Sequence, residues 1–390
     1  MRRPTLPLDV DRLLVAVIAP LALATVVGLV VLWPDGDRPR GPGVVGEPVE
    51  LVDATVEAVR PTACGPGTRA TGCAVAEIRI EDGIDAGATA TLDLVPGPGQ
   101  PDLAPGDAIV VGRASDPQLG TSYYFSDFQR RAPLVVLGVL FAVVVVAVGR
   151  LRGLAALVGV AVSVALVVTF VLPALLEGSS PLAVSIVGSA AIMFVLLYLA
   201  HGVTAMTTAA LVGTLASLAL TGLLAGIFVE AAHLVSGGSE EATLLQFNVG
   251  QVNLQGLLLG SIIIGSLGVL NDVTVTQASA VWQLREADPA MGAGAVYRSA
   301  MRIGRDHIAS AVDTLVLAYA GASLPLLLLF SLAENPVGEV LSGELVASEL
   351  VRTLVGSIGL ALSVPVTTGI AAFVVTRRPP APARARGADR

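Results

Sequence analysis

Long uninterrupted apolar segments dominate the hydrophobic pattern of this 390-residue chain. The hydrocarbon core of a bilayer, about 30 Å thick, is crossed by about 20 apolar residues in a helix, and a helix pairs its own backbone amides in lipid. Eight segments fit this description: residues 13–33, 133–148, 154–172, 182–199, 203–228, 254–281, 308–332 and 350–375. The pattern therefore predicts an all-α polytopic membrane protein with about eight transmembrane helices.

Residues 41–131 follow a different pattern, in which apolar and polar residues alternate with period two, as in half-buried strands. Residues 76–81 and 88–94 alternate in this way on either side of a turn rich in Asp and Gly. Residues 50–59 and 108–113 are predicted to be further strands. Four or five short strands indicate a small β-rich, barrel-like domain inserted after the first helix, and its topology stays open.

The only two cysteines, Cys64 and Cys73, lie in this domain. A disulfide that closes the loop between the first two strands is favoured, because the arginine distribution described below places the domain on the oxidising side of the membrane. Zinc is the alternative, but two cysteines without a nearby histidine are too few ligands. We therefore predict a Cys64–Cys73 disulfide and no metal. The aromatic residues before the second span are predicted to form an outer aromatic belt: Tyr123, Tyr124, Phe125 and Phe128.

Composition and charge support the membrane prediction and orient it. Only 14% of the residues are charged, against about 25% in soluble domains. The net charge of -8 argues against nucleic-acid binding, but the distribution of arginine matters more. With eight spans, four arginine groups share one side: Arg2, Arg3, Arg12; Arg150, Arg152; Arg285, Arg298, Arg302, Arg305; and Arg377, Arg378, Arg384, Arg386. That side is predicted to be the cytoplasm, with both termini there.

These features divide the chain into four parts. We expect a cytoplasmic N-terminus with the first anchor in residues 1–40, the extracytoplasmic β domain in 41–131, a seven-helix body in 132–376 and a disordered cytoplasmic tail in 377–390. The first span is interpreted as an uncleaved anchor in the inner, cytoplasmic membrane, because its apolar run exceeds that of a signal peptide and no A-x-A-like site follows.

A few polar residues inside the spans are the candidate site, because an ionised side chain at the bilayer centre costs about 2.5 kcal/mol or more and is commonly functional. The sixth span enters the cytoplasm and the seventh leaves it, so their inner ends lie at similar depth. The candidate substrate- or ion-binding residues are Asn271, Asp272, Thr276, Gln277, Asp306, His307 and Asp313.

Two interpretations of these residues stay open. Carboxylate, hydroxyl and amide oxygens can hold a cation, or relay protons together with His307. Alternatively, Asp272 and Asp306 form structural ion pairs with Arg302 or Arg305, and Asp306 caps the seventh helix. His201 is interpreted as an ordinary interfacial residue. The hydroxyl residues of the fifth span are interpreted as a seam of helix packing.

The sequence contains no P-loop, H-E-x-x-H, G-x-S-x-G or dinucleotide fingerprint. We therefore expect no enzyme activity and no cofactor.

Residues 268–282, 302–308 and 314–325 resemble the YibE/F family of bacterial multipass membrane proteins, and residues 125–130 resemble its actinobacterial branch. The resemblance implies a multipass membrane protein with, at most, a transport role. The motif positions that it carries over are Asp272, Thr276, Gln277, Arg305, Asp306 and Tyr319. The family pattern usually has Asn where Asp313 stands, which weakens a model with two carboxylates and favours Asp272.

Two functional hypotheses follow. The first is a transporter or permease-like protein for a small ion or solute, coupled through Asp272 near the inner leaflet. The alternative is a non-catalytic envelope scaffold or assembly protein, in which the external β domain binds a protein partner or glycan and the helices anchor it in the lipid bilayer.

Overall fold

The computed structural model describes residues 10–36, 50–64, 72–97, 101–116, 120–235, 237, 240–249, 253–332 and 336–377. The chain forms two compact units. One comprises Met1–Pro42 and Val146–Arg390, and the other comprises Gly43–Val145. Most of the predicted tail lies outside the described residues.

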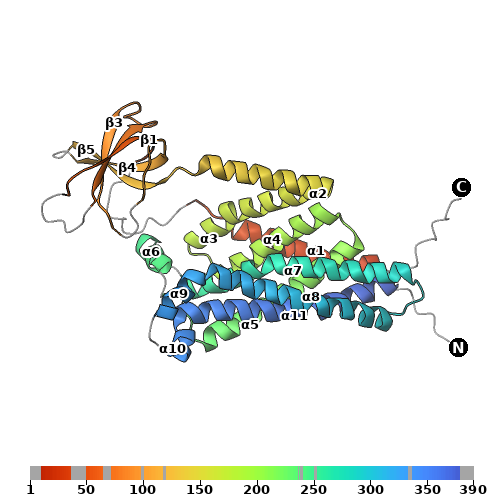
Figure 1. Cartoon of the computed structure of the whole chain (residues 1–390). Coiled ribbons are helices and arrows are strands. Elements are labelled where there is room, and N and C mark those ends of the chain that lie inside the picture. The colour runs from red at the N-terminus through yellow and green to blue at the C-terminus, as the bar shows by residue number, and fades with distance from the viewer. Residues whose placement is uncertain are drawn as a thin grey trace, which may run out of the picture. The chain divides into compact units, whose positions relative to one another are not determined.

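A five-stranded antiparallel sheet forms the smaller unit (Figure 1). Its strands are β1 (Glu50–Pro61), β2 (Ala74–Ile80), β3 (Thr89–Leu94), β4 (Ala108–Asp116) and β5 (Gly120–Phe128). The order across the sheet is β3-β2-β1-β4-β5, and the two outer strands approach each other because the sheet curls. The prediction of a small curled β domain after the first helix is confirmed.

Alternation explains the sheet, because one face of each strand enters a common core. Val52, Ile78, Leu92 and Ile109 are all at most 3% exposed. Strand β5 corrects the predicted aromatic belt, since the aromatic residues that precede the second span lie in this strand. There Phe125 packs against the core of the β domain.

A polar cluster ties the turn after β2 to strands β4 and β5. Tyr123 Oη donates to Asp85 Oδ2 at 2.5 Å, and Arg113 Nε donates to the same oxygen at 2.6 Å. The hydrogen bond from Tyr123, followed by that from Arg113, lowers the pKa of Asp85 below its ordinary value. This contribution to stability is therefore present above the ordinary carboxyl pKa and is lost as pH falls through the lowered one.

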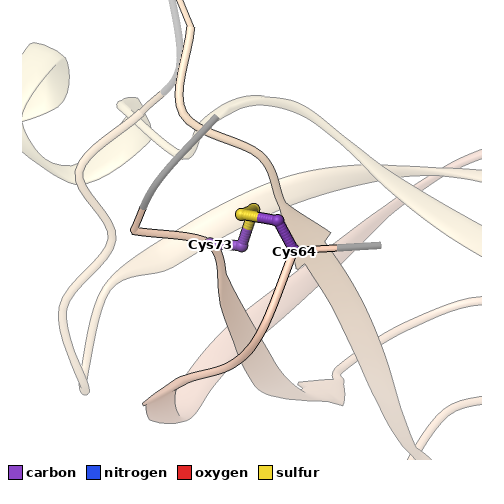
Figure 2. Close-up of a disulfide and its surroundings, with 2 residues drawn as sticks. All are labelled: Cys64 and Cys73. Carbon is purple, nitrogen blue, oxygen red and sulfur yellow. A yellow bond between two sulfur atoms is a disulfide. The ribbon is translucent and has the colours of Figure 1, made fainter. Parts of the chain in front are cut away.

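The disulfide between Cys64 and Cys73 is formed, with the two Cα atoms 5.2 Å apart (Figure 2). It joins the segment after β1 to the segment before β2, as predicted, and a backbone hydrogen bond from Thr62 N to Cys73 O runs beside it.

Replacing Cys64 and Cys73 together by Ser is expected to lower the free energy of unfolding of the β domain by about 2.5 kcal/mol, because a short loop is no longer closed in the unfolded chain. Urea-dependent proteolysis of the purified full-length protein measures this loss, with the single replacement Ser122→Ala as control. Equal urea midpoints for the double variant and the wild-type protein would contradict the expectation.

The larger unit is helical, and the first half of α2 belongs to the smaller unit. The helices are α1 (Val10–Val31), α2 (Arg131–Leu166), the π-helix η1 (Val167–Val171), α3 (Leu172–Leu176), α4 (Pro181–His201), α5 (Ala205–Ala231), α6 (Glu240–Val249), α7 (Leu254–Ala287), α8 (Ala293–Ala322), α9 (Leu324–Leu332), α10 (Val337–Ser342) and α11 (Glu344–Arg377).

Among the described residues, six helices are long and apolar enough to cross a membrane, or seven if α8 and α9, bent by 62°, form one span. The predicted second and third spans lie in one continuous helical stretch, Arg131–Leu176, which contains a non-helical residue, Arg150, with φ 55°. Helix α8 begins at Ala293, well before the predicted start of the seventh span at residue 308.

Helices α5, α7 and α11 pack on one another at the centre of this unit, and α8 packs on α11 (Figure 1). Small residues allow the close approach. A Cβ added at Gly359 would clash with the Thr221 hydroxyl and lie 3.1 Å from Thr221 Cβ, and one added at Gly213 would clash with the Thr367 hydroxyl and lie 3.0 Å from Thr367 Cβ. The buried hydroxyls of Thr214 and Thr274 bond each other at 2.6 Å.

Candidate functional site

Helix α7 carries a continuous face of polar residues and glycines. Its members recur at intervals of three or four residues, which places them on one side of the helix. All are exposed or half-buried, whereas Leu270, Val273 and Ala278 on the other sides are buried. We call this face the α7 stripe: Ser261, Gly265, Gly268, Asp272, Thr276, Ser279 and Gln283.

The end of the α7 stripe at Gln283 lines a cavity of about 820 Å³ in the larger unit. Helices α2, α4, α5 and α8 contribute its other walls. The polar side chains in the lining are Arg152, His201, Thr276, Ser279 and Gln283. Within the stripe, Gln283 Nε2 donates to Ser279 Oγ at 3.2 Å. A volume of this size is typical of small-molecule sites.

Asp272 lies on the same stripe as Thr276, one helical turn farther from the end of α7 that lines the cavity. Its side chain is exposed. Helices α7 and α8 run antiparallel, since Gln277 contacts Ala300 near one end and Gly265 faces Tyr319 near the other. Asp272 is therefore the ionisable group at the point where the stripe leaves the cavity.

Helix α8 extends the same wall. Ile303 lines the cavity, and His307 lies four residues further on, one turn along the same side of α8. His307 is exposed. The structure thus places Thr276 in the cavity, and places Asp272 and His307 one turn beyond it on the two helices.

Gln277 and Asn271 do not face this cavity. Gln277 is buried and its Nε2 donates to the carbonyl oxygen of Ala300 at 2.8 Å, so it links α7 to α8. Asn271 Oδ1 is buried and has no hydrogen-bond partner among the described residues. Both residues are next to stripe residues in the sequence, but their side chains lie on other faces of the helix.

Asp306 and Asp313 are exposed and are not among the described residues that line the cavity. Within the described part of the chain, neither Arg302 nor Arg305 forms an ion pair with an acidic residue. The predicted intramolecular pairs that would pin the sixth and seventh spans are therefore not formed in this structure.

Tyr319 lies near the other end of the α7 stripe. A Cβ added at Gly265 would be 2.9 Å from Tyr319 Oη, so the hydroxyl lies directly over this glycine. The glycine leaves the space that the tyrosine ring occupies. The stripe is thus open at the cavity and covered at Gly265.

The predicted site does not include four polar residues of the cavity lining: Arg152, Ser279, Gln283 and His201, the last of which was interpreted as interfacial. The signal for Gln283 was available, because the three- and four-residue spacing of the stripe continues beyond Ser279 to this residue. No local pattern marks Arg152 or His201, which reach the cavity only through the packing of their helices.

Comparisons with curated proteins and with solved structures find no match. The model of one family, described as YibE/F-like protein, matches residues 137–377, which span α7, α8 and the cavity lining. This match covers more than half of the chain and confirms the resemblance seen in the motif residues around Asp272 and Asp306. The chain therefore belongs to the YibE/F-like family of proteins, and its apolar helices make it a multipass membrane protein.

Proposed function

We propose that this protein is a transporter of a small solute, with the 820 Å³ cavity as its cytoplasmic entrance and the α7 stripe as its path. The proposal includes eight spans, with Arg150 separating the second from the third, both termini in the cytoplasm and the β domain outside the inner membrane. The arginine distribution supports this orientation, because the cavity then opens toward the side where Arg152 and Arg285 lie.

The observation that carries the proposal is the continuity of the stripe. A spanning helix that only anchors a domain gains nothing from a polar face, which is unfavourable against lipid. Here the polar and glycine positions run from Gln283 in the cavity past Asp272 to Ser261, and all are exposed or half-buried, with the Tyr319 hydroxyl lying over Gly265. Such a face is suited to water or a hydrated solute.

Asp272 is a group through which solute movement can be coupled to the binding of a proton or cation. It is the only ionisable side chain on the α7 stripe. Carboxyl groups inside membrane spans serve as proton relays and cation ligands in transporters. Proton or cation binding at Asp272 can therefore be linked to opening and closing. The proposal requires no cofactor and no enzymatic step.

Asp272→Asn is expected to abolish solute-driven proton movement, reducing its rate at least tenfold, because the amide cannot ionise. The measurement uses purified protein in vesicles containing a pH-sensitive dye, with inorganic phosphate and small carboxylates as trial solutes. Glu286→Gln, the same change at an exposed site on α7 outside the stripe, is the control and should retain the wild-type rate. Proton movement that survives in Asp272→Asn would refute coupling through this residue.

The cavity lining favours an anionic solute. Its charged or titratable members are Arg152 and His201, and no acidic residue is among the described lining residues. Thr276, Ser279 and Gln283 add hydrogen-bond donors. Arginine is suited to planar recognition of carboxylate or phosphate groups, and a bond to a charged partner contributes about 1.5–3 kcal/mol.

Arg152→Gln is expected to weaken anion binding about tenfold or more, because it removes the permanent charge of the lining. Thermal unfolding of the protein in detergent, titrated with phosphate or small carboxylates at constant ionic strength, measures the apparent dissociation constant. Arg298→Gln changes an exposed residue of α8 outside the lining, and this variant should bind the anion as tightly as the wild-type protein does. Equal weakening in both variants would indicate general charge screening instead of a site.

A second candidate function, an envelope scaffold, is favoured by one observation. The outer strands β3 and β5 of the small domain border a groove of about 830 Å³, lined by Thr91, Asp93, Tyr123 and Tyr124 among others. Tyr124 is 46% exposed. Edge strands offer unpaired backbone groups, and tyrosine suits a polar partner such as a peptide or glycan.

Thr91→Trp fills this groove and separates the two functions. If the protein is a scaffold, the variant is expected to reproduce the phenotype of the gene deletion, whereas a transporter is expected to keep the proton movement of the helical body and the wild-type phenotype. Thr62→Trp, also exposed but outside the groove, is the control and should be silent. A wild-type phenotype for Thr91→Trp, measured at equal membrane abundance, would exclude the groove as the functional surface.

A further inference from the structure

The side of α8 directed away from the helical body carries charges. Arg302, Asp306, Ala309 and Asp313 recur at intervals of three or four residues and are all exposed. The opposite side of α8 holds Gly304 and Leu315, which are buried. We call Arg302, Arg305, Asp306, Ala309 and Asp313 the outward face of α8. It is distinct from the cavity wall, which α8 forms with Ile303.

This face is unsuited to lipid, and Asp313 shows why. It lies 20 residues after Ala293, which corresponds to about 30 Å along the helix from that end. Only α9 and the last part of α8 follow it in the bent span. An ionised carboxylate inside the hydrocarbon costs about 2.5 kcal/mol or more, so Asp313 requires a polar neighbour that the described part of the chain does not provide.

Among the described residues, none covers the exposed side chain of Asp313. The first half of α2 belongs to the other compact unit, and residues 133–148 contain only apolar side chains, proline and glycine. That segment can fill space against lipid but cannot donate a hydrogen bond or balance a charge. Another molecule with its own polar groups at the same depth would supply such a cover.

The outward face of α8 is complementary to itself. It carries two basic and two acidic residues, Arg302 and Arg305 against Asp306 and Asp313, and its charges therefore balance. Ala309 lies near its centre, and Arg305 and Asp306 lie on opposite flanks of the line that joins Arg302 to Ala309. A twofold axis along the membrane normal brings the opposite flanks of two copies together at equal depth.

We propose that two copies of this chain associate in the membrane through the outward face of α8. Arg305 of each copy pairs with Asp306 of the second copy, which makes two reciprocal ion pairs. The small side chain of Ala309 permits the helices to approach. The two Asp313 carboxyls lie at equal depth near the axis, where each is a polar neighbour of the other.

Ala309→Cys tests this proposal directly, because the two native cysteines are joined in a disulfide and leave the introduced thiol free. Oxidation or a short bis-maleimide in native membranes is expected to give a product of twice the 39.5 kDa chain mass. Ala216→Cys, the same change at an exposed position of α5, is the control and should stay monomeric. Absence of the dimer for Ala309→Cys, or a product of any other mass, would overturn the proposal.

Charge exchange tests the reciprocal pairs. In the Ala309→Cys background, Arg305→Asp and Asp306→Arg are each expected to reduce cross-linking more than tenfold, because each places like charges together. The combination of both restores opposite charges across the axis and should restore the cross-link. Failure of the combined variant, at membrane abundance equal to that of the single variants, would overturn the proposed pairing. None of these readouts depends on transport.

Discussion

Lipid offers no hydrogen bonds, and this constraint shapes the helical body more than any single contact. Four buried hydroxyls of the central helices bond back to their own backbone: Thr214 to Ala210 O, Ser217 to Gly213 O, Thr221 to Ser217 O and Thr368 to Val364 O. Each of these four has a partner within its own helix, and Thr214 also bonds Thr274 of α7. The same residues are small, so the helices that carry them can approach closely at Gly213 and Gly359.

That arrangement separates two kinds of polar residue that look alike in the sequence. The serines and threonines of α5 are buried and serve packing, as the sequence interpretation expected. Those of the α7 stripe are half-buried, and two of them, Thr276 and Ser279, line a cavity. Composition alone does not distinguish them, because both helices combine leucine with glycine and hydroxyl residues. The difference lies in which side of each helix the neighbouring helices cover.

The apolar runs predicted most of the fold because span length depends on bilayer thickness and little else. The β domain was predictable for a similar reason, since alternation fixes which side chains enter the core. Strand β5 was missed because its aromatic residues next to a span have two physical uses, as an interfacial belt or as a core. The early start of α8 was missed because the part of the helix around Arg298 and Arg302 is polar, and a search for apolar segments does not detect a polar helix.

The candidate site could be predicted only in part, and helix geometry explains where the prediction failed. Asp272 and Thr276 are one turn apart and share the stripe, whereas Gln277 is rotated by about 100° and packs against Ala300. Selecting residues by polarity and proximity in sequence therefore mixed two faces of one helix. Arg152 and His201 come from other helices and enter the site through tertiary packing alone.

The two uncovered polar faces differ in a way that bears on their roles. The α7 stripe carries a single ionisable group, Asp272, and is otherwise neutral, whereas the outward face of α8 carries two positive and two negative charges. A permanent contact between identical surfaces must balance its charges within itself, because nothing mobile neutralises them. A path needs no such balance, because the passing solute, its water or a proton supplies the compensating charge. A neutral stripe with one carboxyl therefore suits movement, and a balanced face suits association.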